Sequence, residues 1–197
     1  MRKLLLILSI IYAPFAIAQQ SNFAKYLGNK SAKLFIPSQK ISLNPILNSF
    51  QHTVHNYNIP NELIAAFMKS MKLDLHKTKY NTVEEYNEYI YGSADVVGLM
   101  CLKVFVNGNI EQYEELKHSA MRLGSAFQKV NFLRDLKDDY EILNRSYFPG
   151  VDLKKLDILA KNKIIDEIEE DFFEAFKGIK MLPLEAKFGV YTAYIYY

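Results

Sequence analysis

Four polar residues recur at helical spacing between positions 128 and 139, in a stretch that is otherwise rich in apolar residues. They are Gln128, Asn131, Asp135 and Asp139, and on a helix they fall within a stripe about 80° wide. Mg²⁺ prefers oxygen ligands and completes its shell with one or two carboxylates, waters and phosphate oxygens. The spacing therefore predicts a metal and diphosphate site in which Asp135 and Asp139, one turn apart, hold the ion.

Cationic and small residues accompany this stripe. Arg134 and Arg145 offer guanidinium groups, which bind phosphate oxygens in pairs. Ala120 and Gly124 continue the stripe towards the start of the helix, where they leave room either for a ligand or for close helix packing. A run with charges of both signs is also typical of a solvated helix face, so from spacing alone both interpretations stay open.

The order of these residues resembles the second aspartate-rich motif of the squalene and phytoene synthases. That motif, Q-x-x-N-x-x-R-D-x-x-x-D, is followed in the family by R-x-Y-(L/F)-P, which residues 145–149 match. Residues 89–100 resemble the family's Y-x-x-x-x-A-G-x-V-G-x-M helix, with Asp95 in place of a glycine. An acid there either changes the polarity of the cavity or faces another helix, and its role stays open. The resemblance runs from about Ile41 to the end of the chain.

The resemblance implies an all-α isoprenoid-synthase fold, a helical bundle around a central cavity. It implies a Mg²⁺-dependent prenyltransferase of isoprenoid and carotenoid biosynthesis. Such an enzyme condenses two prenyl diphosphates head to head, here geranylgeranyl diphosphate to phytoene, with farnesyl diphosphate as the other candidate substrate. Carried over by position, the family's roles are metal binding for Asp135 and Asp139, substrate binding for Gln128, Asn131 and Tyr147, and catalysis for Tyr89, Arg134 and Arg145. Without the family, Tyr89 is typical of a buried core tyrosine with a hydrogen-bonded hydroxyl.

The start of the chain departs from the family. Members carry a first aspartate-rich motif upstream of the matching region, which binds the other half of the metal and diphosphate cluster. Here no Asp precedes Asp74, and Glu62 is the only acid in that stretch. We therefore expect this half-site to be missing and condensation by this chain to be impaired.

Residues 1–18 have a basic start, an apolar run and an Ala-Ile-Ala sequence, which is the form of a secretory signal peptide. The run is short for a bilayer-spanning helix of about 20 residues, and Pro14 disfavours the alternative of a buried first helix. We predict that residues 19–40 form a linker and that residues 41–197 form a partial squalene/phytoene synthase-like helical domain. A foreign or misread start would explain both the leader and the missing motif. The last helix reaches Tyr197 without a cap, so we expect the bundle to be incomplete at both ends.

Composition agrees with one helical domain. The chain has 197 residues, half of them apolar, with six prolines and no internal repeat. The net charge is +2, and the basic residues are scattered among acidic ones. They form no basic stripe of the kind that binds nucleic acids. The single Cys101 is typical of a buried thiol in a reducing compartment. We expect a cytoplasmic protein in peripheral contact with the membrane, or an exported one if the leader is genuine.

Periodicity and capping signals predict helices throughout the chain and no sheet. Thr82 with Glu85 forms a capping-box pattern and Asn109 begins a second candidate. The predicted helices are 43–57, 60–77, 83–106, 110–143, 153–181 and 183–197.

Two other function classes stay open beside the enzyme. One is a relative that keeps the fold and serves binding or assembly without catalysis, and the other is an exported helical protein. The intact second motif favours the enzyme, whereas the missing first motif favours the non-catalytic relative.

Overall fold

The structure is a computed structural model that describes residues 45–136, 146–149 and 158–197. Its elements are α3 (Pro45–Asn56), α4 (Asn61–Leu73), α5 (Val83–Ile90), the π-helix η1 (Tyr91–Asp95), α6 (Val96–Phe105), α7 (Ile110–Arg134), α9 (Ile158–Ile179) and α10 (Leu184–Tyr196). Among these described residues the only strand-like pairing is an isolated bridge between Lys79 and Ser146. The predicted all-α class is therefore confirmed.

The helices begin where the sequence offers capping groups. At the start of α5, Thr82 Oγ1 accepts a hydrogen bond from the Glu85 backbone N–H at 3.2 Å. The Glu85 carboxylate reaches back and accepts from the Asn81 N–H at 2.9 Å, one residue earlier than in the usual box. Asn109 Oδ1 accepts from the Gln112 N–H at 3.0 Å and caps α7. These side chains satisfy N–H groups that have no partner within the helix.

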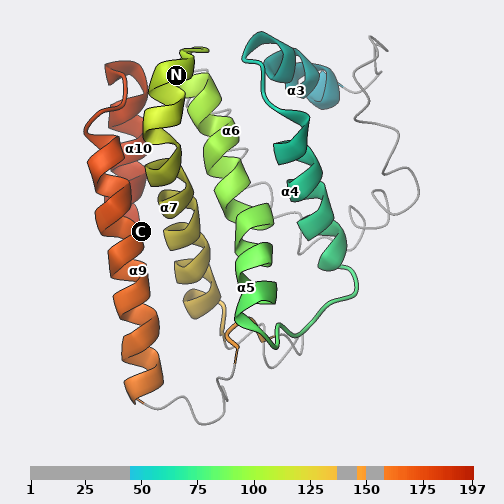
Figure 1. Ribbon diagram of the computed structural model, residues 1–197, viewed down its shortest axis with the longest axis vertical. Coiled ribbons are helices and arrows are strands. Elements are labelled where there is room, and N and C mark those ends of the chain that lie inside the picture. Colours follow the sequence, from blue (N-terminus) through green and yellow to red (C-terminus); the bar gives the residue numbers. More distant parts are fainter. Residues whose placement is uncertain (1–44, 137–145, 150–157) are drawn as a thin grey trace.

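Helix α6 lies at the centre of the bundle. Its side chains are almost all buried, and Val96 and Leu102 are 0% and 2% exposed. Helix α4 packs on one side of α6 and α7 on the other, while α9 lies along α7 and α10 lies against α9 (Figure 1). Lys103 is the only charged residue of α6, and a helix that is apolar on all sides is stable when other helices surround it.

The segment predicted as one helix over 83–106 is continuous but contains the π-helical turn η1. Where η1 and α6 meet α7, the backbones approach closely because both sides carry small residues. A Cβ added to Gly98 would lie 2.4 Å from the Ala120 carbonyl oxygen, and one added to Gly124 would lie 2.7 Å from that of Ala94. Gly124 therefore allows close helix packing, one of its two interpretations, and it also lies with Ala120 in the wall of the cavity described below, which agrees with the other.

Helix α7 ends earlier than predicted. It stops at Arg134, and Asp135 occupies its C-cap with φ −93° and ψ 3°. Asp135 still donates its backbone N–H to the Asn131 carbonyl oxygen at 2.9 Å, but its carboxylate binds the Arg134 side chain beside it. A short acidic side chain that bonds locally favours a helix end over a helix interior. Residues 137–145, which include the last part of the predicted helix (137–143), lie outside the described residues, as do residues 1–44.

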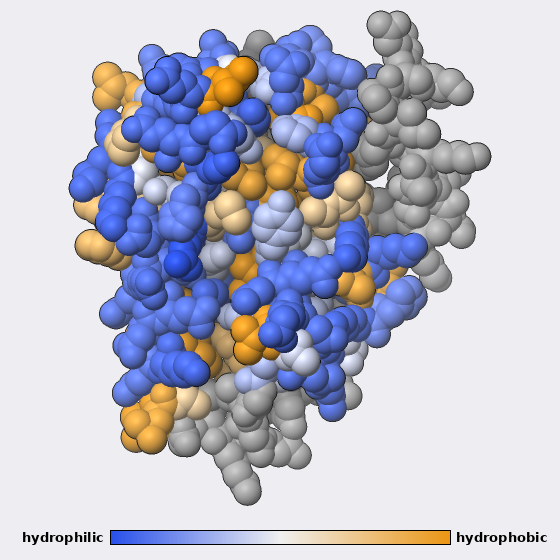
Figure 2. Space-filling model, viewed as in Figure 1, coloured by the Kyte–Doolittle hydropathy of each residue, from blue (hydrophilic) through white to orange (hydrophobic). Residues whose placement is uncertain are grey.

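The surface is mixed in polarity. On the face shown in Figure 2, hydrophobic residues are visible along the middle of the molecule with hydrophilic residues on both sides. Large apolar side chains are also exposed along one side of α10: Leu184, Phe188, Tyr191 and Ile195. Within the described ranges, no helix has the length and apolarity needed to cross a membrane.

Candidate active site

A cavity of about 120 Å³ lies between α6, α7, α9 and α10. Its wall consists mainly of small and apolar side chains, such as Gly98 and Ala120, with Cys101 and Leu102 deeper along α6. No charged side chain contributes to the part of the wall that the structure describes. The bundle therefore encloses a predominantly apolar space, as expected of the predicted fold.

Gln128 and Asn131 bring polar groups to this wall, as their spacing predicted. Both belong to α7, and their side chains are buried, at 6% and 3% exposure. Ser93, in η1, lines the same cavity. Asn131 Oδ1 and Ser93 Oγ are buried and have no hydrogen-bond partner among the described residues. The Arg134 end of α7 therefore carries the polar part of the cavity.

Asp135 follows at the end of α7 and is half-buried. Its two carboxylate oxygens accept hydrogen bonds from Arg134, Oδ1 from Nε at 2.8 Å and Oδ2 from Nη2 at 2.7 Å. The carboxylate favours the charged guanidinium, so the pKa of Arg134 is raised. To bind a metal ion, Asp135 would have to exchange this partner.

The rest of the predicted metal site is only partly visible. Asp139 and Arg145 lie outside the described residues, so their roles stay predictions. Within the described part of the chain, no group of three or more His, Cys, Asp or Glu side chains is placed to hold a metal ion. Oxygen donors that suit Mg²⁺ are nevertheless present, in the Asp135 carboxylate and in the unpartnered Asn131 Oδ1, one turn apart. These described donors fit the ion in type and would supply part of its shell.

Tyr89 and Tyr147 lie in an aromatic cluster and do not line the cavity. The ring of Phe132 stacks on Tyr147 at 4.0 Å between centroids, and Tyr89 stacks on Tyr147 at 5.7 Å. Burial, followed by the nearby Asp74 carboxylate, raises the pKa of Tyr89 well above its ordinary value. This environment is the buried core that was the alternative interpretation of Tyr89. The roles that the resemblance assigns to both tyrosines stay predictions.

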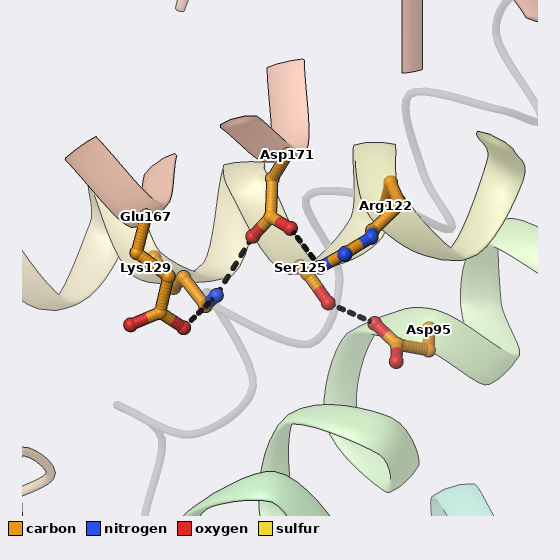
Figure 3. A network of polar contacts seen from close by, with 6 residues as sticks. All are labelled: Asp95, Arg122, Ser125, Lys129, Glu167 and Asp171. Atoms are coloured by element: carbon orange, nitrogen blue, oxygen red, sulfur yellow. Dashed lines mark hydrogen bonds and ion pairs between the residues drawn. The ribbon is translucent and has the colours of Figure 1, made fainter. Parts of the chain in front are cut away.

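A buried network of charged and polar side chains joins α7 to α9 (Figure 3). Asp171, on α9, is 0% exposed, and it accepts hydrogen bonds from Arg122 Nη1 at 2.6 Å and from Lys129 Nζ at 2.7 Å. The buried Lys129 also forms an ion pair with Glu167, one turn earlier on α9. Arg122 and Lys129 are seven residues apart, so they leave the same side of α7. The two bonds to Asp171 fix the rotation of α7, whose opposite side faces the cavity.

Asp95 extends this network to η1. It is 8% exposed and accepts a hydrogen bond from Ser125 Oγ at 2.6 Å, with its carboxylate turned towards α7 (Figure 3). Burial raises the pKa of Asp95 to about 6, while the Ser125 hydroxyl opposes that shift. Of its two interpretations, the structure therefore supports the one in which Asp95 faces another helix.

The network contains residues that sequence reasoning did not single out. Asp171 occupies a place in the buried stripe of α9 that otherwise holds Ile164, Ile168 and Ala175. An acid in an apolar stripe signals a buried partner, because an unpaired buried charge is costly. The partner, Lys129, follows Gln128 directly within the polar motif.

Comparison with known proteins shows which family this chain resembles in sequence. The family model described as squalene/phytoene synthase matches residues 19–197, a range that includes the predicted linker. The chain is 27% identical over 165 residues to a phytoene synthase of Pseudescherichia vulneris, covering 76% of this chain and 52% of the relative. It is 30% identical over 149 residues to a 15-cis-phytoene synthase of Synechocystis sp., covering 64% and 44%. The chain thus spans about half the length of these curated relatives.

Solved structures agree on the fold. The squalene synthase HpnC from Alicyclobacillus acidocaldarius superposes with a TM-score of 0.75 at 18% identity, covering 99% of this chain and 80% of that one. A dehydrosqualene synthase, solved in complex with a ligand, superposes with a TM-score of 0.79 at 18% identity, covering 99% and 74%. The likeness confirms the all-α isoprenoid-synthase fold.

Proposed function

Since this chain belongs to the squalene/phytoene synthase family, we propose that it takes part in the head-to-head condensation of two prenyl diphosphates. Geranylgeranyl diphosphate, giving phytoene, is the substrate we propose, and farnesyl diphosphate is the alternative. The observation that carries this proposal is the arrangement of the cavity. Its apolar wall ends in the amides of Gln128 and Asn131, next to Asp135.

The polar end of the cavity would bind the metal ion and the diphosphate, and its apolar end would hold the prenyl chain. Asp135 with Asp139, assisted by Asn131, would hold Mg²⁺, and Arg134 and Arg145 would bind diphosphate oxygens. Mg²⁺, when bound, supplies positive charge that stabilises the departing diphosphate.

The apolar end of the cavity protects a reactive prenyl cation. Small and aliphatic side chains line the space between α6, α7, α9 and α10, and an apolar wall around a bound prenyl chain leaves little room for water. Burial raises the pKa of Cys101 to about 12, so this thiol in the wall stays protonated and is a weak nucleophile. The wall therefore offers the cation few groups to attack it.

We further propose that the 197-residue chain condenses these substrates poorly. The family's first aspartate-rich motif has no counterpart in the sequence before Asp74. One group of carboxylates leaves the first departing diphosphate with less charge stabilisation than two groups would provide.

We propose a cytoplasmic location with peripheral membrane contact. The apolar side chains exposed on α10, among them Leu184 and Phe188 at 79% each, support this proposal. Apolar side chains on one side of a helix can enter the boundary between headgroups and acyl chains.

Binding of farnesyl thiodiphosphate tests the site without requiring turnover. We expect Mg²⁺ to tighten its binding about tenfold or more, which corresponds to about 1.4 kcal/mol or more. The double variant Asp135→Asn, Asp139→Asn should lose this dependence, because amides replace both carboxylates. Calorimetric titration with and without Mg²⁺ measures the difference.

The control for this titration is Asp166→Asn, which removes an exposed carboxylate from α9. It should bind the analogue as the unmodified chain does. Binding that ignores Mg²⁺, or that survives unchanged in the double variant, would contradict the proposed site.

A further inference from the structure

Helix α10 carries an apolar seam on the side that faces solvent. The seam consists of Leu184, Phe188, Tyr191 and Ile195, which are 79%, 79%, 43% and 63% exposed. The helix lies at one edge of the bundle, next to α9 (Figure 1), and none of its residues is buried. A helix that is apolar on several sides is stable when other elements surround it. The described residues leave the seam largely uncovered, so we looked for a partner that fits it.

The spacing of the seam is that of a helix that pairs with another helix. From Leu184 to Ile195, its residues follow one another at intervals of four, three and four positions. This is the a/d pattern of a coiled coil, in which each apolar side chain inserts between side chains of the facing helix. The seam contains no charged residue, and Glu185 and Lys187 lie beside it. The seam is therefore complementary to a second copy of itself.

The opposite side of α10 is already in use. Gly189, Val190 and Ala193 line the cavity, and at about 100° per residue they lie across the helix from the seam. Tyr194 stacks with Phe176 of α9 at 5.5 Å between ring centroids. These contacts fix the rotation of α10, so a second helix can reach the seam without disturbing the cavity wall.

The area of the seam is sufficient for a reversible pair of chains. At about 200 Å² for each large side chain, the observed exposures leave about 500 Å² of the seam uncovered. Two copies that cover each other would bury about 1,000 Å², which is the lower end of the range for specific interfaces. An interface of this size suits a weak pair, with a Kd of about 1 to 100 μM.

We propose that in solution a second copy of this chain covers the seam, in a two-fold dimer in which α10 packs on α10. A two-fold interface uses the same surface on both chains and closes on itself. This pairing goes beyond the proposed condensation and does not rest on it, since it requires neither substrate nor Mg²⁺. The same side chains support the proposed membrane contact, so pairing in solution and contact with a membrane exclude each other.

Sedimentation velocity of the full chain, without lipid or detergent, tests the pairing at concentrations from about 5 to 500 μM, which span the expected Kd. We expect the sedimentation coefficient to rise with concentration from that of a monomer to that of a dimer. Phe188→Glu puts a charge in the middle of the seam, so it should raise the Kd about tenfold or more. Ile195→Glu should act in the same way. Both positions are exposed, and circular dichroism checks that both variants keep the fold.

The control is Val83→Glu, which makes an apolar-to-acidic change at a position of α5 that is 58% exposed. It should pair as the unmodified chain does. A chain that stays monomeric over this range, pairing that survives in both seam variants, or assemblies larger than a dimer would overturn the proposal.

Vesicles of phosphatidylcholine and phosphatidylglycerol distinguish lipid from a second copy. If the chain stays monomeric and binds these vesicles, with binding lost in Phe188→Glu, lipid covers the seam; the dimer is then wrong and the membrane contact stands. Because no prenyl diphosphate is present, these outcomes are separate from those of the thiodiphosphate titration.

Discussion

Replacing Asp171 with alanine should lower the free energy of unfolding by about 3 to 5 kcal/mol, the usual cost of breaking a buried ion pair. Asp171 is 0% exposed and accepts hydrogen bonds from both Arg122 and Lys129. Its removal leaves the buried ammonium of Lys129 with one carboxylate, that of Glu167, which is 46% exposed. Urea denaturation followed by circular dichroism measures the loss.

Two further variants separate the ion pair from the packing of α9. Glu170→Ala, at an exposed position next to Asp171, should change the unfolding free energy by less than about 0.5 kcal/mol. The double variant Asp171→Leu, Lys129→Met should be more stable than Asp171→Ala, because no unpaired charge stays buried. A loss below about 1 kcal/mol in Asp171→Ala would show that Lys129 and Arg122 find other partners.

Replacing Asp95 with asparagine should make the protein more stable at neutral pH, by about 2 to 3 kcal/mol. Burial raises the pKa of Asp95 from its ordinary value of 3.8 to about 6, and each pKa unit corresponds to about 1.36 kcal/mol. Between these two values the folded chain binds more protons at this position than the unfolded chain does. The contribution of Asp95 to stability is therefore greatest below about pH 4 and is lost as the pH rises through about 6.

The pKa of Asp95 depends on the charged and polar side chains around it. Ser125 donates a hydrogen bond to it, Asp171 repels its charge, and Lys129 and Arg122 attract it. Asparagine keeps the shape and can still accept from Ser125. The variant should therefore lose the decrease in unfolding free energy between pH 4 and pH 7 that this position causes.

Denaturation at several pH values tests this expectation for Asp95→Asn, the unmodified chain and Asp166→Asn. Asp166 is exposed on α9, so its variant should follow the unmodified chain. If Asp95→Asn and the unmodified chain show the same dependence on pH, Asp95 does not titrate in this window.

The helices were predictable where local signals set them. Side-chain caps at Thr82 and Asn109 mark the starts of α5 and α7 in the sequence, and the structure contains both bonds. The π-helical turn η1 was not predictable, because nothing local distinguishes it from the α-helix around it. The turn lies where η1 packs closely against α7, at the contact between Ala94 and Gly124, and such a contact between distant segments cannot be read from local sequence.

The same distinction applies to the candidate site. Spacing along one helix was enough to place Gln128 and Asn131 on the cavity side of α7. Pairing between helices was not predictable, since Lys129 and Asp171 are 42 residues apart and meet only because α7 packs along α9. The position of Tyr89 likewise depends on its contacts with Tyr147 and Phe132.

The position of Cys101 gives the chain a built-in chemical reporter. It is the only cysteine of the sequence, it lines the cavity at 7% exposure, and its pKa of about 12 keeps the thiol protonated. Alkylating reagents react with thiolates that they can reach, so labelling has to wait until the bundle opens around α6. The alkylation rate of Cys101 therefore reports how often the bundle opens around α6. A molecule that fills the cavity should lower this rate.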